Sequence, residues 1–515
     1  MKKFFNKLFL SKSSMTIFTA LAALAVLFDY SERYSFVFVD NTVFKGFSMA
    51  IFILMIANSA LLFILSSMRM RNADVYYKKS FRAIYLISVA YSIFSILFSV
   101  ITLITGGSQN LQLTFLMCKE IFPIWIAAVT ILYVFLILPF MFNQKRKRFA
   151  GIVISVGLAF AVYASLFPIS PYKLTSGPAV FDNGKSYSVV FSTNDKGTGY
   201  IEYEFGGESV KLFDQSNGRK NGDSIIHTIK VPYEQLNGNS YKIGSTRVID
   251  ELSYGGRSGK TVESHEYSFG GNFSDDINLL SVSDWHTYMS LAKSSISHLG
   301  NYDAVLLLGD GAPGLMFEEE AATNIIEFAS DLTNGTMPII FTRGNHETRG
   351  KAAAQLADYL GFDEFYFKAS LGDYNFIVLD SGEDKEDSHP EYGGMVAYEQ
   401  SRKDMVSWLE TLENTTGSKT IALSHSDEIC IEEDLALRAK QKLSELNTSI
   451  LLSGHQHKTE YKADGVYPVL VDGGINANGK GTFVASMVSL SQNGINIKSV
   501  DNTGKVVLTE TAEWK

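Results

Sequence analysis

The stretch SILLSGHQHK, residues 449–458, places His455 and His457 one residue apart, directly after an apolar run. The chain has only nine histidines in 515 residues, so two of them this close together need an explanation. A solvated surface seldom requires such a pair, whereas metal sites use imidazole nitrogens as ligands. The pair therefore indicates one corner of a metal site at the end of a buried strand.

From about residue 274 onward, apolar runs of strand length alternate with helical stretches such as YEQSRKDMVSWLETLEN. This alternation predicts an α/β domain whose strands are buried on both faces. Ligands of open α/β sheets bind at the carboxyl ends of the strands, so the residues after each run are candidates for chemistry. The runs INLLSVS, AVLLLG, PIIFTRG and TIALS are followed by such polar side chains: Asp284 and His286, Asp310, Asn345 and His346, and His425.

Each fragment alone has an ordinary interpretation. An Asp after a strand is usually a turn or cap residue, and GNHE could be a Gly-Asn turn that enters a helix. The ordered set of five fragments is not explained in this way. Mixed oxygen and nitrogen ligands suit Mn²⁺, Fe²⁺ or Zn²⁺ rather than Ca²⁺. Seven ligands are too many for one Zn²⁺, so the set predicts two divalent metal ions that share a bridging carboxylate.

The motifs D-x-H, G-D, G-N-H-E, a lone His and G-H-x-H, in this order, resemble those of the calcineurin-like metallophosphoesterases. The resemblance extends from Ile277 to near the C-terminus and implies a four-layer αββα sandwich that holds a dinuclear site. It assigns the residues as follows: Asp284, His286 and His457 to the first metal, Asn345, His425 and His455 to the second, Asp310 to the bridge, and His346 to catalysis as general acid or transition-state stabiliser.

The chain departs from the family pattern next to the bridging residue. Many members have a second Asp three residues beyond it, whereas GDGAPG places Pro313 there. His346 therefore lacks the carboxylate partner that the pattern implies. The purple acid phosphatase branch, which also joins a β-sandwich to this domain, has a Tyr at that spacing to hold Fe³⁺. The domain order resembles that branch, but Pro313 and His286 argue against a purple Fe³⁺ site.

Three further residues lie near the motifs. Arg343 and Arg349 flank the GNHE turn and are candidate substrate-binding residues, because cationic donors stabilise charge on phosphate oxygens. A structural ion pair beneath the turn is the alternative for both. His389, in the segment GEDKEDSHPEYGG (382–394), is predicted to be a surface residue.

Residues 171–273 show short alternating runs such as YSVVFST (187–193) and GYIEYEF (199–205), separated by Gly, Asn and Asp clusters. Closely spaced strands with turn signals predict a small β-sandwich. We expect it to act as a spacer ahead of a metallophosphoesterase domain at 274–515, with glycan or substrate binding as the alternative.

Five nearly uncharged apolar stretches precede residue 170, and most reach the ~20 residues that a helix needs to cross a bilayer. They predict a transmembrane domain over 1–170 with about five α-helical spans, at 14–29, 46–67, 83–105, 121–142 and 149–167. The first stretch follows MKKFFNKLFLSK, so a cleaved signal peptide is its alternative interpretation.

Lys and Arg are concentrated in alternate connecting segments. The N-terminus and segments 68–82 and 143–148 carry thirteen, whereas the segments between them carry three. Basic segments stay in the cytoplasm. The sequence therefore predicts a multi-pass protein of the cell membrane, embedded in the lipid bilayer, with a cytoplasmic N-terminus and with everything after residue 168 outside.

The charge balance differs between the two regions. Residues 1–168 carry sixteen Lys and Arg against five Asp and Glu, whereas the remainder carries twenty-nine against forty-nine. An acidic exterior repels nucleic acid, so no nucleic-acid binding is expected. The two cysteines, Cys118 and Cys430, lie in different regions and offer no disulfide framework, which suits a bacterial envelope better than an animal cell surface.

Together these features predict a membrane-anchored, extracytoplasmic enzyme that hydrolyses a phosphodiester or phosphomonoester. The expected substrate is a phosphate ester of the envelope, either lipid-linked or in a polymer, or an extracellular nucleotide, because tethering raises the local concentration of membrane-bound substrate. The alternative is a non-catalytic receptor or sensor that binds metal or phosphate at the cell surface. A glycan-binding protein with secondary hydrolysis is a third possibility.

Overall fold

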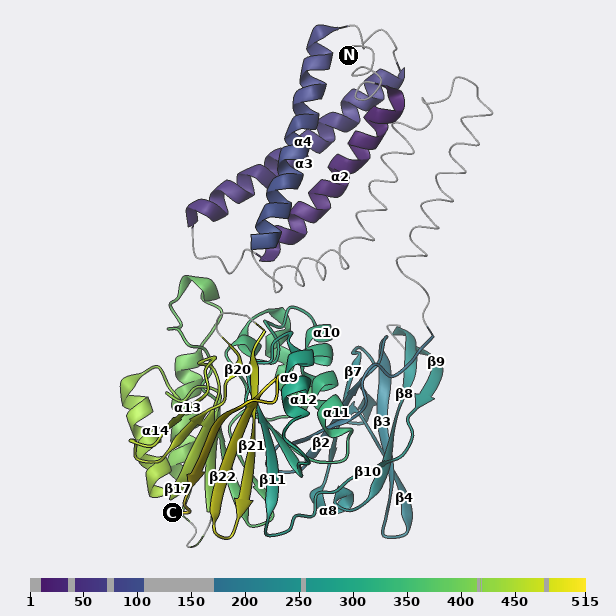
Figure 1. The fold of residues 1–515 in the computed structure, drawn as a ribbon. Coiled ribbons are helices and arrows are strands. Elements are labelled where there is room, and N and C mark those ends of the chain that lie inside the picture. Colours follow the sequence, from purple (N-terminus) through teal and green to yellow (C-terminus); the bar gives the residue numbers. More distant parts are fainter. Residues whose placement is uncertain are drawn as a thin grey trace. The chain divides into compact units, whose positions relative to one another are not determined.

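The computed structural model describes residues 11–35, 42–71, 78–105, 171–251, 256–414, 417, 419–476 and 481–515 (Figure 1). The chain forms two compact units, Met1–Ser170 and Pro171–Lys515. The described part of the first unit is helical, and the second contains all the described strands.

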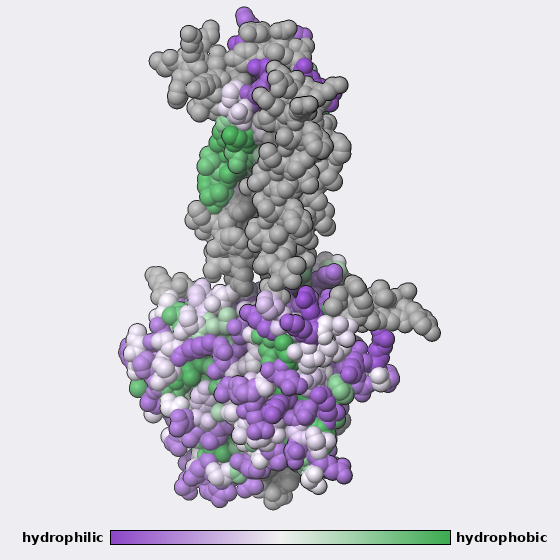
Figure 2. Space-filling model, turned by 90° about the vertical axis from the view of Figure 1, so that its right-hand side faces the viewer, coloured by the Kyte–Doolittle hydropathy of each residue, from purple (hydrophilic) through white to green (hydrophobic). Residues whose placement is uncertain are grey.

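The first unit contains three described helices that contact one another: α2 (Lys12–Ser35), α3 (Thr42–Arg71) and α4 (Lys79–Thr105). Met55 and Tyr85 are fully buried in their shared core. Large apolar side chains such as Ile53 and Ile87 are exposed to the surroundings of the helices. Figure 2 shows an apolar surface on this unit, in contrast to the largely hydrophilic face of the second unit. An exposed apolar surface of this kind suits contact with lipid.

Two described helices are long and apolar enough to cross a membrane: Met49–Arg71 and Lys79–Ile101. They overlap the predicted spans 46–67 and 83–105. The predicted span 14–29 lies within α2, which is not one of these two helices. The predicted spans 121–142 and 149–167 lie outside the described residues. Of about five predicted spans, the described part of the chain therefore supports two.

The second unit is built on two large sheets. The first has the strand order β23-β22-β21-β11-β12-β13-β1-β2-β7, with β20 paired to β21. Strands β11, β12, β13 and β1 are parallel to their neighbours in this set, and the remaining pairs are antiparallel. The bounds are β1 Ala179–Asp182, β2 Tyr187–Ser192, β7 Ile226–Val231, β11 Ile277–Val282, β12 Ala304–Leu307, β13 Ile339–Phe341, β20 Gly474–Ile475, β21 Phe483–Ser491, β22 Gly494–Asp501 and β23 Val506–Ala512.

The second sheet has the strand order β14-β15-β16-β17-β19-β18. Its four inner strands are parallel, and β14 and β18 close the two edges in the antiparallel sense. The bounds are β14 Phe367–Leu371, β15 Tyr374–Leu379, β16 Lys419–Ser424, β17 Thr448–Ser453, β18 Glu460–Lys462 and β19 Val469–Val471.

The side chains of β15 show how the layers form. Phe376 and Val378 are buried in the core that the two sheets share. The alternate residues Ile377 and Leu379 pack with Met405 on the opposite, helix-covered face. Because successive side chains of a strand point to opposite faces, a fully apolar strand must be covered on both sides. The predicted αββα sandwich is confirmed.

Helices cover both outer faces of the sandwich (Figure 1). The first sheet is covered by α9 (Met289–Ile296), α10 (Glu318–Glu320), the π-helix η3 (Ala321–Glu327), α11 (Phe328–Thr333) and α12 (Leu356–Leu360). The second is covered by α13 (Tyr398–Thr411) and α14 (Glu433–Glu445). Three 3-10 turns lie in the loops: η4 (His346–Thr348), η5 (Lys351–Gln355) and η6 (Pro390–Tyr392).

Residues 171–273 do form two packed sheets, but one of them is part of the first large sheet. Strand β1 pairs in parallel with β13 through Phe181 and Ile339, and β2 and β7 extend the sheet from there. A five-stranded sheet packs against these strands over a core that includes Phe191, Ile201 and Ile243. Its five strands are β3 Gly197–Phe205, β4 Glu208–Phe213, β8 Ser240–Glu251, β9 Gly256–Glu263 and β10 Tyr267–Ser268. The short elements of this region are the paired strands β5 Gln215–Ser216 and β6 Arg219–Lys220, and the helix α8 Tyr233–Leu236. No break in the first sheet separates residues 171–273 from the strands that follow.

Candidate metal centre

All eight residues of the predicted centre lie just beyond the carboxyl ends of five strands. Strands β11, β12 and β13 of the first sheet lead to five of them, and β16 and β17 of the second sheet lead to three. The structure brings the side chains of seven of them into three overlapping groups whose ligand atoms lie within 4.8 Å of one another: Asp284 with His286 and His457, Asp310 with His425 and His455, and Asp310 with His286 and His346. Asp310 and His286 each belong to two of these groups.

The backbone at these positions is unusual. Five of the residues adopt a left-handed conformation that non-glycine residues rarely occupy: Asp284 (φ 47°), His286 (φ 40°), Asp310 (φ 56°), His455 (φ 69°) and His457 (φ 50°). Such strain persists only where the surrounding structure imposes it, and it concentrates at functional sites. All five residues lie in the turns that follow β11, β12 and β17.

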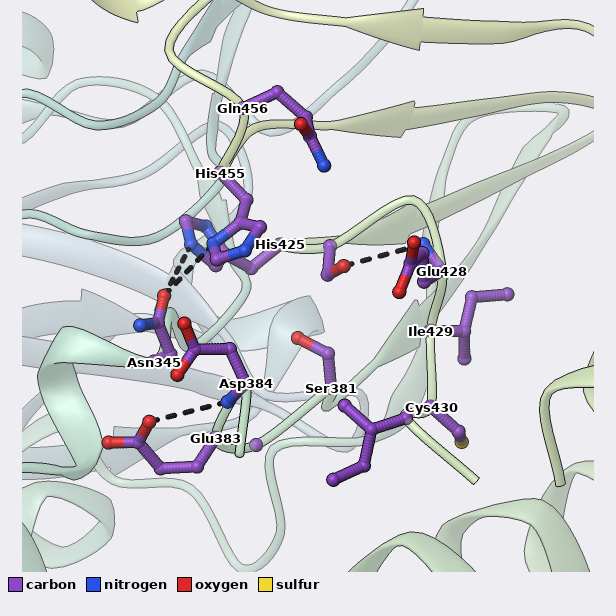
Figure 3. A pocket seen from close by; sticks show the side chains of 13 residues that line it. Asn345, Ser381, Glu383, Asp384, His425, Glu428, Ile429, Cys430, His455 and Gln456 are labelled. Atoms are coloured by element: carbon purple, nitrogen blue, oxygen red, sulfur yellow. Dashed lines mark hydrogen bonds between the residues drawn. The ribbon is translucent and has the colours of Figure 1, made fainter. Parts of the chain in front are cut away.

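Asn345 and two histidines converge on one point (Figure 3). The Asn345 Oδ1 atom lies 3.1 Å from His425 Nε2 and 3.2 Å from His455 Nδ1. His425 Nε2 also lies 3.3 Å from Asp310 Oδ2. Two oxygen atoms and two ring nitrogens thus crowd a space that one cation could fill, which fits the second predicted metal.

The donor set of the first predicted metal contains an unpartnered oxygen atom. Asp284 Oδ1 is buried and has no hydrogen-bond partner among the described residues, and His286 faces Asp310 Oδ2 through Nε2 at 3.9 Å. His457 Nε2 lies 3.7 Å from Asp284 Oδ1, too far for a hydrogen bond. A buried carboxylate oxygen without a partner is unfavourable, and a divalent cation between these atoms would satisfy it. The residues therefore fit a metal ion here.

Two of the histidines are oriented from behind by backbone carbonyls. His425 Nδ1–H donates to the Leu308 carbonyl at 2.7 Å, and His457 Nδ1–H donates to the Ile475 carbonyl at 2.7 Å. A hydrogen bond of this kind fixes the ring and leaves Nε2 for a metal, as is usual for metal-binding histidines.

The electrostatics of the cluster favour a cation. Burial would raise the pKa of Asp310, but the neighbouring imidazoles of His425 and His346 hold it well below its ordinary value. Burial lowers the pKa of His425, yet the charge of Asp310 outweighs it and raises the pKa to about 10. The ionised Asp310 therefore holds a proton on His425, at a place where a divalent cation could supply the positive charge instead.

Glu347 is a functional residue that the sequence analysis did not assign. Its fully buried carboxylate accepts the backbone N–H groups of Asp310, Gly311 and Ala312 at 2.8, 2.6 and 3.0 Å, and that of Gly344 at 2.8 Å. Glu347 thus ties the turn that carries Asp310 to the turn that carries Asn345. The signal in the sequence that could have identified Glu347 is its position as the last residue of the GNHE motif.

His346 finds its partners in Pro313 and Arg349. Its Nδ1–H donates to the Pro313 carbonyl at 3.0 Å, so a main-chain oxygen serves where many relatives have Asp. Its Nε2 consequently accepts a hydrogen bond from Arg349 Nη1 at 3.3 Å. The His346 side chain is 22% exposed, so a substrate oxygen could approach it.

The two arginines are both engaged in ion pairs. Arg343 donates from Nε to Asp380 Oδ1 at 3.2 Å, and its guanidinium lies 4.7 Å from the centre of the Phe365 ring. Arg349 donates from Nε and Nη2 to the two oxygens of Glu383 at 2.6 and 3.0 Å. For Arg343 these contacts favour the structural ion pair over substrate binding, whereas Arg349 also reaches His346. The side chain of His389 is 27% exposed, and its Nδ1 atom lies 3.7 Å from Glu391 Oε2.

A cavity of about 200 Å³ opens beside the second predicted metal position (Figure 3). Asn345, His425 and His455 line one part of it. The segments 381–384 and 428–431, which follow β15 and β16, supply most of the rest. The cavity is therefore placed to receive the organic part of a phosphate ester.

The fold and this centre define a phosphate-ester hydrolase. Residues 277–459 match the family model described as calcineurin-like phosphoesterase, a segment that contains all eight residues of the centre. This part of the chain is therefore similar to that family. A comparison with curated proteins gives no match.

Several solved structures are similar to part of the chain at low sequence identity. The anchor in the inner membrane complex of Plasmodium (GAP50) is 15% identical over 47% of this chain and 90% of its own, with a TM-score of 0.34. The phosphopantetheinyl hydrolase of Mycobacterium tuberculosis is 14% identical over 40% and 92%, with a TM-score of 0.28. The phosphoesterase YfcE of E. coli is 16% identical over 45% and 98%, with a TM-score of 0.23.

Proposed function

We propose that the chain is a membrane-anchored, metal-dependent phosphoesterase whose second unit lies outside the cytoplasm. It hydrolyses a phosphodiester or phosphomonoester of the cell envelope or of the extracellular space. The observation that carries the proposal is the convergence of Asp310 with imidazoles from both sheets in overlapping groups that could hold two metal ions.

Two divalent ions would be held as the family resemblance implies, with Asp284, His286 and His457 at one, Asn345, His425 and His455 at the other, and Asp310 between them. When bound, such ions neutralise phosphate charge and lower the pKa of water to about 7. In the hydrolysis a water molecule gives up a proton as its oxygen bonds to phosphorus, the bond from phosphorus to the alcohol oxygen breaks, and the alcohol oxygen takes up a proton.

His346 is the group best placed to exchange that proton. Because the Pro313 carbonyl holds Nδ1–H, proton exchange must take place at Nε2. Arg349 Nη1, hydrogen-bonded to Nε2, keeps a positive charge beside this atom. The His346 ring and Arg349 would therefore both stabilise the charge that develops on the departing oxygen.

The proposal is tested with the full chain in detergent micelles. A generic aryl phosphodiester and its monoester are supplied with Mn²⁺, Fe²⁺, Zn²⁺ or a chelator. We expect metal-dependent turnover that the chelator abolishes and that His425→Ala lowers by at least about 100-fold. His298→Ala, an exposed histidine outside the centre, serves as the matched control. Tight binding of two ions without turnover of either ester would favour a sensor and contradict the proposal.

A further inference from the structure

The cavity beside the candidate metal centre has a charge pattern that hydrolysis alone does not require. Three of its lining residues are acidic, namely Glu383, Asp384 and Glu428, and none of its described lining residues is Lys or Arg. A phosphate at the centre would therefore direct its organic group toward carboxylates. A second anionic group on the substrate would be repelled there.

The three carboxylates differ in how far they are neutralised. Glu383 is held by Arg349 and by the Tyr392 hydroxyl at 2.8 Å. Asp384 is partly exposed and lies 3.2 Å from Arg349 Nη2 and 3.5 Å from Lys385 Nζ. Glu428 is exposed and forms no ion pair among the described residues, because Lys462 is bound to Asp427 at 2.6 Å. Arg349 and Lys385 thus balance the charges of Glu383 and Asp384, and Glu428 adds a carboxylate that has no ion pair among the described residues.

A buried hydroxyl in the same cavity lacks a partner. Ser381 is 5% exposed, and its Oγ forms no hydrogen bond among the described residues. It lines the cavity together with Asp384 and Glu428, as Figure 3 shows. Buried hydroxyls are nearly always hydrogen-bonded, so Ser381 Oγ would take a donor from a water molecule or from a ligand in the cavity.

The volume of the cavity limits the size of the organic group that it could hold. Pockets for drug-sized ligands usually measure about 300–1,000 Å³, whereas this cavity measures about 200 Å³. A short alcohol fits such a space better than a nucleoside does. Unpaired oxygen acceptors and a net negative lining call for a compact cation that carries N–H donors.

We propose that this cavity binds a primary ammonium group, so that the substrate is a phosphate ester of a short amino alcohol, such as an aminoethyl ester. The proposal rests on the phosphoesterase function. The ammonium group would donate to Ser381 Oγ and lie between Asp384 and Glu428, while the phosphate occupies the centre near Asn345.

The test compares two aryl phosphodiesters that differ only in charge. The 4-nitrophenyl ester of 2-aminoethyl phosphate and that of propyl phosphate have nearly the same shape, since an ammonium replaces a methyl group. We expect the full chain with Mn²⁺ to have a kcat/KM at least about tenfold higher for the aminoethyl ester. Calorimetry with aminoethyl phosphate and propyl phosphate should show the same preference in binding, independently of turnover.

Two variants test whether Glu428 and Ser381 cause the preference for the aminoethyl ester. Glu428→Gln removes the free carboxylate and Ser381→Ala removes the unpaired hydroxyl, and each should reduce the aminoethyl-to-propyl ratio by about threefold or more. Glu413→Gln, exposed after α13 and outside the cavity, should leave the ratio unchanged. A ratio near one in the unaltered chain, or a ratio that neither variant lowers, overturns the ammonium site even though hydrolysis persists. No turnover of either ester would instead contradict the phosphoesterase function.

The same chemistry could come from a lipid headgroup or from a soluble ester. Vesicles that contain phosphatidylethanolamine distinguish the two sources when the water-soluble products are measured. Release of aminoethyl phosphate or aminoethanol from the vesicles supports the ammonium site with a lipid as its source. Turnover restricted to the soluble aminoethyl ester supports the site with a soluble source.

Discussion

At the scale of single residues, Glu347 shows how one buried carboxylate organises the centre without touching the reacting atoms. It satisfies four backbone N–H groups from two separate turns. Those turns carry Asp310 and Asn345 and follow different strands of the first sheet, β12 and β13. Loss of the carboxylate would leave buried donors unpaired and let the two turns move independently.

We therefore expect Glu347→Gln to weaken metal binding by about 10–100-fold, because one amide N–H₂ would face N–H donors in place of an acceptor. Calorimetric titration of the full chain with Mn²⁺ measures this effect. Glu364→Gln, an exposed glutamate, is the matched control. Unchanged metal affinity in Glu347→Gln would show that the two turns are held by other contacts.

Arg343 provides a second residue-scale prediction. Its bond to the buried Asp380 implies that Arg343→Met destabilises the fold by about 3–5 kcal/mol, since a buried carboxylate would lose its partner. A lowered thermal midpoint that Asp380→Asn partly restores in the double variant would support the structural role. A normal midpoint with a raised KM would instead support substrate binding by Arg343.

At the scale of elements, the junction of β1 with β13 decides how the second unit is built. The short runs at 187–193 and 199–205 correctly predict strands β2 and β3, because alternation is a local property of the sequence. The pairing of Phe181 with Ile339 is not local, and no periodicity marks it. The predicted spacer at 171–273 consequently shares a sheet with the catalytic strands.

This junction predicts that a chain beginning at residue 274 does not fold by itself. Removal of β1 would expose the edge of β13, and Phe341, which packs against Phe181 with ring centres 6.1 Å apart, would lose part of its cover. We expect residues 274–515 to aggregate, in contrast to residues 171–515, when solubility and circular dichroism are compared. A soluble, cooperatively melting 274–515 would establish the independent spacer.

At the scale of the whole molecule, the two units differ in the polarity of their surfaces. The helical unit exposes large apolar side chains such as Ile87, whereas the second unit is predominantly hydrophilic on the face shown in Figure 2. The distribution of Lys and Arg at the N-terminus, 68–82 and 143–148 favours a cytoplasmic location for these segments.

The orientation is tested by labelling intact cells with a membrane-impermeant maleimide. Ser216→Cys, at an exposed position of β5, is introduced after Cys118 and Cys430 are replaced by Ala. We expect labelling without lysis, since this residue belongs to the unit proposed to lie outside. A matched Ser13→Cys near the N-terminus should be labelled only after lysis. The reverse pattern would place the catalytic unit in the cytoplasm.

Local patterns in the sequence predict an α/β domain and the polar residues that follow its strands, because a strand buried on both faces reads as a continuous apolar run. The four-layer αββα arrangement and the roles of the eight residues are what the family resemblance implies. The partners of the site residues and of Arg343 are visible only in the folded chain: Glu347 accepts from the turn that carries Asp310, the Pro313 carbonyl accepts from His346, and Asp380 accepts from Arg343. The pairing of β1 with β13 and the acidic lining of the cavity are also visible only in the folded chain. Contacts between segments far apart in the chain depend on how the sheets pack, and packing leaves no periodic trace in the sequence.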